Sequence, residues 1–118
     1  MNSLYRVDWT GDGAIALTIS YSVFHISGSN HQIESGKVQY LLIRNGGTVV
    51  CTNTTLHSNH NLASGTLSVV WDFNYNTSTL TAIRMTTTSS YGGNGFTNCI
   101  LEGLGDTASN CAVARFNL

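Results

Sequence analysis

The sequence contains no proline, a single lysine and two glutamates, and only 9% of its residues are charged. Lysine and glutamate are among the usual residues of exposed helices, so this composition argues against a helical protein. Polarity comes instead from 15 threonines, 13 serines and 12 asparagines, accompanied by 12 glycines. These short neutral residues suit strands and turns. Without proline, edge strands must be protected by polar side chains, closure or oligomerisation.

The charge balance favours no polyanionic partner. The net charge is −1, and the basic residues are scattered along the chain, at Arg6, Lys37, Arg44, Arg84 and Arg115. Nucleic-acid binding normally requires a basic patch, so we expect no nucleic-acid partner. No apolar run approaches the roughly 20 residues of a membrane span, so we expect no membrane insertion. The N-terminal MNSLYRVDW lacks a signal-peptide pattern, which indicates a chain made in the cytosol or a fragment without its signal.

The chain has three cysteines, and this odd number argues against a secreted disulfide framework. Cys51 and Cys99 lie beside apolar residues, which predicts buried thiols. A bridge between Cys99 and Cys111, closing a short loop, is the alternative.

Alternation of apolar and polar residues is the main structural signal. Between positions 14 and 26, one face carries Ile15, Leu17, Ile19, Tyr21 and Val23, and the other is small or polar as far as Phe24. A period of two over this length predicts a long strand with one face in the core.

Asn45-Gly46 is the preferred pair for a two-residue type I′ turn. A turn there pairs Leu42 with Val49 and Tyr40 with Cys51, and it makes both faces of the 39–51 hairpin apolar. We therefore expect cover on both sides, from a second sheet and from another subunit.

A second hairpin is predicted around Asn76. Trp71, Phe73 and Tyr75 alternate with polar residues, which favours a core face over a sugar-stacking platform. Further alternating segments lie at 3–9, 96–104 and 110–118, with turn-like stretches between strands, including SGK (35–37) and HSNHNLASG (57–65). The pattern predicts an all-β protein: one domain over residues 1–118, an antiparallel β-sandwich or jelly roll of about seven or eight strands.

No catalytic pattern is present. His57 and His60 have metal-like spacing but lack the third and fourth ligands of a zinc site, so a solvated loop is favoured. The segment 8–13 resembles fragments of calcium loops, yet no bidentate glutamate follows and a strand-ending turn is favoured. No carboxylate pair, nucleophile turn or phosphate loop can be identified. We predict no enzymatic activity, no cofactor, and no catalytic or metal-binding residues.

The stretch SSYGGNGFTNC, Ser89 to Cys99, is the candidate recognition loop. Glycines permit close approach of the backbone to a ligand, Tyr91 offers a ring and a hydroxyl, and Asn94 offers a donor and an acceptor. Ser90, Tyr91 and Asn94 are therefore the predicted ligand-binding residues. The alternative is a loop that tucks Tyr91 back onto the sheet while Phe96 plugs the end of the sandwich.

The proline-free texture, the RNGGT hairpin with two apolar faces and the final strand ARFNL together resemble the C-terminal β-sandwich domains of bacteriophage tailspike and tail-fibre proteins. Many of those domains are jelly rolls like tumour necrosis factor or C1q. The resemblance implies a homotrimer assembled without disulfides in the host cytoplasm and carried on the virion tail. It also implies a host cell-surface glycan or receptor as partner.

Two other functional classes fit the same sequence. One is a free-standing, extracellular lectin or carbohydrate-binding module acting as a monomer or dimer. The other is a capsid-decoration or other structural β protein. Solution mass separates the fibre domain from the lectin, because a trimer favours the fibre domain and a monomer favours the lectin.

Overall fold

The computed structural model describes residues 2–77, 79–92, 95–106 and 110–115, with only the backbone described at 2 and 75–77. Those residues form strands and turns without a helix. The strands are β1 (Asn2–Trp9), β2 (Gly13–Ser27), β3 (Asn30–Asn45), β4 (Thr48–Leu62), β5 (Leu67–Thr77), β6 (Leu80–Ser89), β7 (Gly95–Gly105) and β8 (Cys111–Arg115). The prediction of an all-β protein is confirmed.

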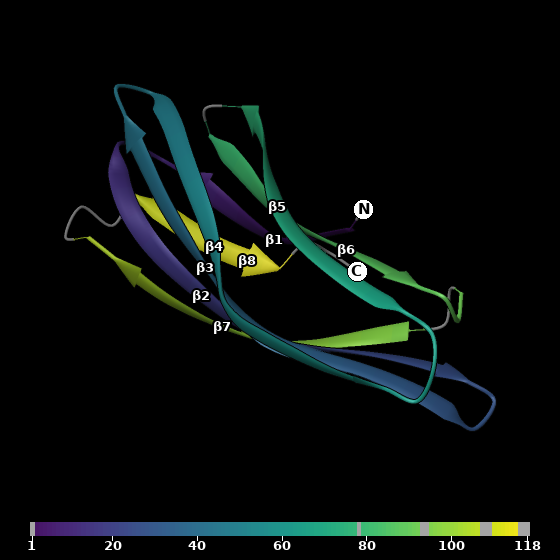
Figure 1. Ribbon diagram of the computed structural model, residues 1–118. Helices are drawn as coiled ribbons and strands as arrows, with labels where there is room; N and C mark the ends of the chain where they lie inside the picture. Colours follow the sequence, from purple (N-terminus) through teal and green to yellow (C-terminus); the bar gives the residue numbers. More distant parts are fainter. Residues whose placement is uncertain (1, 78, 93–94, 107–109, 116–118) are drawn as a thin grey trace.

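The strands form two antiparallel four-stranded sheets with the orders β5-β6-β1-β8 and β4-β3-β2-β7 (Figure 1). The long strands β2, β3 and β4 make a curved meander, and the shorter sheet lies against its inner side. The molecule is elongated, with principal extents of 51 × 23 × 18 Å. A jelly roll winds two Greek keys. Here the consecutive strands β2, β3 and β4 are neighbours in one sheet. The predicted antiparallel β-sandwich is therefore confirmed, without the winding of a jelly roll.

Alternating burial along each strand explains why these segments pair as they do. In β2, Leu17, Ile19, Tyr21 and Val23 are at most 3% exposed, whereas the residues that alternate with them face outward. β3 continues the pattern with Val38, Tyr40 and Leu42, which lie beside β2 in the register that joins Leu17 to Tyr40. Side chains opposite each other on paired strands share a face, so the inner face of this sheet is continuous and apolar.

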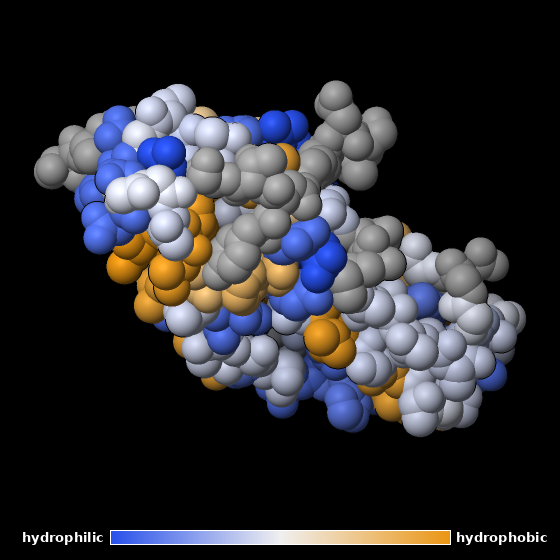
Figure 2. Space-filling model, turned by 90° about the horizontal axis from the view of Figure 1, so that it is seen from above, coloured by the Kyte–Doolittle hydropathy of each residue, from blue (hydrophilic) through white to orange (hydrophobic). Residues whose placement is uncertain are grey.

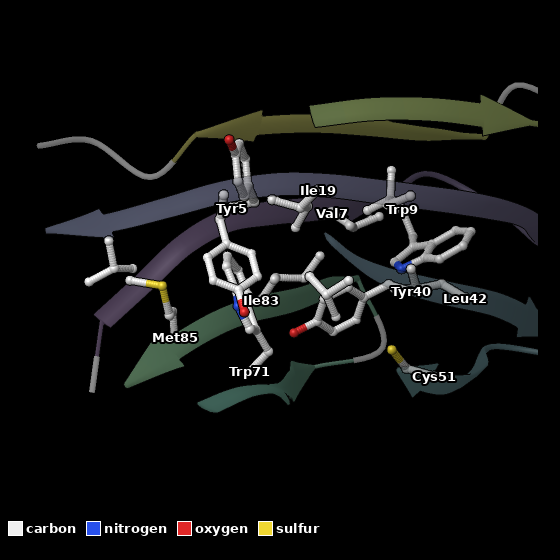
Figure 3. Packing of buried hydrophobic residues seen from close by; sticks show 14 residues of the cluster. Tyr5, Val7, Trp9, Ile19, Tyr40, Leu42, Cys51, Trp71, Ile83 and Met85 are labelled. Carbon is white, nitrogen blue, oxygen red and sulfur yellow. The ribbon is translucent and has the colours of Figure 1, made fainter. Parts of the chain in front are cut away.

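The two sheets bury a single cluster of large side chains between them (Figure 3). Polar bonds also cross the interior: the Tyr40 hydroxyl donates to the Asp72 carbonyl at 2.8 Å, and the Asn53 amide donates to the Trp71 carbonyl at 3.0 Å. Burial raises the pKa of Tyr40, because the phenolate would lose its hydration. The predicted inward face of β5 is confirmed for Trp71 and Phe73, which belong to this core; the Tyr75 side chain lies outside the described residues.

The β3–β4 turn lies one residue later than predicted. Gly46 and Gly47 form it, with φ angles of 60° and 78°, and Asn45 pairs with Thr48. Leu42 therefore pairs with Cys51 rather than with Val49, and Tyr40 pairs with Asn53 rather than with Cys51. Both turn amides donate to the Asp12 carboxylate, at 2.7 and 3.2 Å, so a distant side chain helps hold this turn. The new register moves β4 by two residues, so each side chain keeps its predicted face.

Ser35-Gly36-Lys37 is not a turn, contrary to the sequence prediction, because β3 runs straight through it. A Cβ on Gly36 would lie 2.5 Å from the His57 carbonyl oxygen and 2.9 Å from the Tyr21 hydroxyl. Glycine is present here to let β4 and Tyr21 approach, which is a packing role rather than a turning role.

The predicted loop at 57–65 is also mostly strand. β4 extends to Leu62, with a register irregularity opposite Lys37 and Val38, and the turn that follows is confined to 63–65. β4 is the edge of its sheet, and its residues 54–61 are all exposed, which explains why their polarity looks like that of a loop.

The three cysteines are all free thiols, and the alternative Cys99–Cys111 bridge is not formed. The prediction of a buried thiol is confirmed for Cys51 and only in part for Cys99. Cys51 is 6% exposed, and Cys99 and Cys111 are half-buried. Burial raises the pKa of the Cys51 thiol to about 12, so at neutral pH it is almost entirely protonated.

We expect Cys51 to react very slowly with a thiol reagent in the native protein, because the thiolate is the reactive form and access is blocked. The measurement is labelling of a Cys99→Ser, Cys111→Ser variant at pH 7, followed by mass. Labelling should become rapid when urea unfolds the chain. Equally rapid labelling in both states would contradict the burial of Cys51 on the inner face.

Candidate functional site

The end of the sandwich beside the predicted recognition loop is held together by a hydrogen-bonded cluster around Gln32. The Gln32 side chain is 1% exposed, and its amide donates to the carbonyls of Ser64 and Thr66 at 2.8 and 3.2 Å. Its carbonyl accepts from the Ser89 hydroxyl at 2.6 Å. One side chain from β3 thus joins the β4–β5 turn to the end of β6, across the two sheets.

Two of the predicted ligand-binding residues already make hydrogen bonds within this cluster. The hydroxyls of Tyr91 and Ser64 share a hydrogen bond of 2.7 Å, and Tyr91 is half-buried. The Ser90 hydroxyl accepts from the Thr66 amide at 2.9 Å, although Ser90 itself is exposed. Asn94 lies outside the described residues. Tyr91 and Ser90 are close to the same turn, and a role in ligand binding stays a prediction for all three.

Phe96 does not plug the end of the sandwich, as the alternative interpretation supposed. It lies on the outer face of β7, is 55% exposed, and stacks on Phe24 of β2 with ring centroids 4.9 Å apart and planes 18° apart. The partly buried Phe24 thus accounts for the point in β2 at which the outward face is no longer small or polar.

The outer face of the β4-β3-β2-β7 sheet carries apolar residues at the end near the β3–β4 hairpin. Leu41, Ile43, Val50 and Leu104 are 48%, 52%, 57% and 79% exposed. Between the ridges of β3 and β7 lies a cavity of about 390 Å³ whose floor includes Ala14 and Ala16. Figure 2 shows apolar surface gathered toward the end of the molecule where this hairpin lies. The predicted apolarity of both hairpin faces is confirmed; the described part of the chain covers the inner face and leaves the outer one exposed.

The histidine pair does not form a metal site with its neighbours. His57 pairs with Lys37 and His60 pairs with Glu34, so their side chains leave opposite faces of β4. Both are exposed, and they lie on a strand rather than in the predicted loop. Among the described residues, no three metal-ligating side chains come together.

Several carboxylates are held by arginines. Asp72 and Arg84 form a two-pronged pair at 2.9 and 3.1 Å, and Asp8 pairs with Arg6 at 2.8 Å. Asp12 contacts Arg44 at 3.3 Å, and the Gly46 and Gly47 amides hold its pKa below the ordinary value. The 8–13 segment is the predicted strand-ending turn, and Asp12 anchors the adjacent hairpin.

One carboxylate is held by a tyrosine instead. The Tyr21 hydroxyl donates to buried Glu34 at 2.9 Å, and the pKa of Tyr21 is raised mainly by burial and also by this contact.

Sequence reasoning missed both Gln32 and the pairing of Phe24 with Phe96. A signal for Gln32 existed, because it is in phase with Val38, Tyr40 and Leu42 and therefore faces the core. The pairing of the two phenylalanines depends on the register of β2 with β7, which their separation in the chain conceals.

Comparisons with protein-family models, with curated proteins and with solved structures find no match for this chain. Within the described residues, no helix has the length and apolarity needed to cross a membrane.

Proposed function

We propose that this chain is a self-associating receptor-binding domain, the C-terminal domain of a viral tail fibre or tailspike, acting as a homotrimer on the virion. The observation that carries the proposal is the apolar end of the outer sheet face, formed by Leu41, Ile43, Val50 and Leu104. Clustered apolar surface of this kind marks interaction sites, because monomers rarely expose it. Three reduced cysteines support assembly in a host cytoplasm.

The surroundings of the apolar end favour another copy of this chain as the partner over a charged macromolecule. Leu104 projects from β7 beside the shallow groove over Ala14 and Ala16, so ridge and groove lie next to each other. A neighbouring copy can place its own ridge into this groove, and three copies close around an axis if each contributes both elements. The rim includes Glu102 and Gln39, which suits a polar border around an apolar centre.

Light scattering at micromolar concentration tests this assembly. We expect the wild type to have three times the 12.7 kDa mass of one chain. Leu104→Asp should be monomeric, because a carboxylate is stable on a solvated strand and costly in an apolar interface. Its far-ultraviolet circular dichroism should match the wild type, since Leu104 is 79% exposed.

The matched control is Val70→Asp, on the outer face of the other sheet, where the side chain is 53% exposed. This variant should assemble as the wild type does. A monomeric wild type, or a Leu104→Asp variant that stays trimeric, contradicts the proposed assembly surface.

A free-standing lectin is the second candidate. The exposed Phe96 ring beside Phe24, on an otherwise neutral part of the same sheet face, favours it. A monomeric wild type that binds glycans would support this function over the fibre domain.

A further inference from the structure

A small cavity of about 160 Å³ opens on the outer face of β2, halfway along the sheet and away from its apolar end. Ser20, Ser22, Ser35 and Asn98 supply polar groups to its lining, and Ile100 forms one wall. Pockets for drug-sized ligands usually measure about 300–1,000 Å³. This cavity therefore has the size for one small ring rather than for a large cofactor.

The aromatic pair lies directly beside this cavity. Ser22 pairs with Asn98, and two residues further along the same strands Phe24 pairs with Phe96. Two residues in a strand correspond to about 7 Å, close to the width of one sugar ring. Phe24 covers one face of the Phe96 ring, which is still 55% exposed. A ligand ring in the cavity can thus reach an aromatic surface.

The hydroxyls of the cavity are already ordered. The Ser22 hydroxyl donates to the Ser35 hydroxyl at 3.1 Å, and that hydroxyl donates to the Tyr21 carbonyl at 3.1 Å. A hydroxyl has one donor and two acceptor lone pairs, so Ser22 keeps an acceptor toward the cavity. The exposed Asn98 amide adds a donor and an acceptor. Fixed donors and acceptors of this kind match a ligand rich in hydroxyls.

Charge complementarity selects an uncharged ligand. The cavity lining contains no charged side chain among the described residues, and the nearest charged residues on this face, Lys37 and Glu102, have opposite signs. An acidic sugar or a phosphate would find no cluster of cations here.

We infer that this cavity and Phe96 form a subsite for one neutral sugar ring of a glycan. The ring stacks on Phe96 and its hydroxyls bond to Asn98 and Ser22. This inference rests on the proposed receptor-binding function, and it places the sugar on the sheet face rather than at Tyr91. Assembly uses Leu41 and Leu104 at the other end of the face, so both functions coexist.

The test is a nuclear magnetic resonance titration of the ¹⁵N-labelled wild type with glucose, galactose and N-acetylglucosamine, each at millimolar concentration. We expect at least one sugar to shift the amides of Ser22, Phe96 and Asn98. Phe96→Ala should weaken that binding roughly tenfold, the size expected for loss of an aromatic contact. Val70→Ala should bind as the wild type does, and each variant should remain folded under the conditions of the titration.

Absence of shifts at these amides with every sugar overturns the inference, as does unchanged binding by Phe96→Ala. Shifts confined to Ser64 and Tyr91 would place the sugar at the loop instead. Failure of the proposed assembly is seen separately, as a monomer in light scattering, and does not alter the outcome of this titration.

Discussion

Leu42→Ala is expected to lower the free energy of unfolding by about 2–5 kcal/mol, whereas Leu41→Ala should change it by no more than about 0.5 kcal/mol. The two leucines are adjacent in β3 and point to opposite faces of the sheet. Leu42 is 1% exposed within the core, and Leu41 is 48% exposed on the outer face. Truncating Leu42 loses its buried apolar surface and leaves a cavity, because the neighbouring strands can close it only in part.

Urea unfolding of the two variants provides the measurement, carried out in the Leu104→Asp background so that assembly does not add to stability. A domain of this size has about 5–15 kcal/mol of total stability, so the loss at Leu42 is large enough to shift the midpoint strongly. Equal losses at both positions would mean that both faces of β3 are covered within one chain, and the assignment of faces would be wrong.

The same two leucines show what the sequence could reveal. Alternation in β2 and β3 separates inward from outward residues without knowledge of any partner, because the side chains of a strand leave opposite faces in turn. For that reason the apolar character of both hairpin faces was predictable. It did not depend on the register, which moved by two residues and left every side chain on its face.

The position of the hairpin turn was beyond local reasoning. Asn45-Gly46 and Gly46-Gly47 both accept the positive φ that a type I′ turn requires. In the structure, the Asp12 carboxylate binds the Gly46 and Gly47 amides from more than 30 residues away. Similarly, Ser35-Gly36-Lys37 has the composition of a turn, but Gly36 provides space for Tyr21 and for β4. Such contacts exist only once distant strands have paired.

The candidate site shows the same limit. Tyr91 was identifiable from its glycine-rich surroundings, but its hydrogen bond with Ser64 depends on how the β4–β5 turn meets the end of β6. Phe24 and Phe96 become neighbours only through the pairing of β2 with β7. The sequence therefore pointed to the region of the recognition residues, and the fold decides which side chains share a surface.

Gln32→Leu is expected to destabilise the end of the sandwich that carries Tyr91, by about 1–3 kcal/mol. Leucine has a similar size, so the buried position stays filled. The carbonyls of Ser64 and Thr66 lose their donor and the Ser89 hydroxyl loses its acceptor, and all three hydrogen bonds are partly buried in the wild type. The cost is the unsatisfied hydrogen-bonding capacity rather than lost packing.

Hydrogen exchange resolves this effect in space. The Thr66 amide donates to the Ser90 hydroxyl, and the Ser90 amide donates to the Thr66 carbonyl at 3.0 Å. Both amides should exchange faster in Gln32→Leu, because local opening needs less free energy than global unfolding. Gln39→Leu is the control, since Gln39 lies on the same strand but faces outward. In this variant the amides of Thr66 and Ser90 should exchange at the wild-type rate. If Gln32→Leu leaves both amides protected, the Gln32 cluster does not hold the two turns together, and Tyr91 must be positioned by its bond to Ser64 and the strand ends alone.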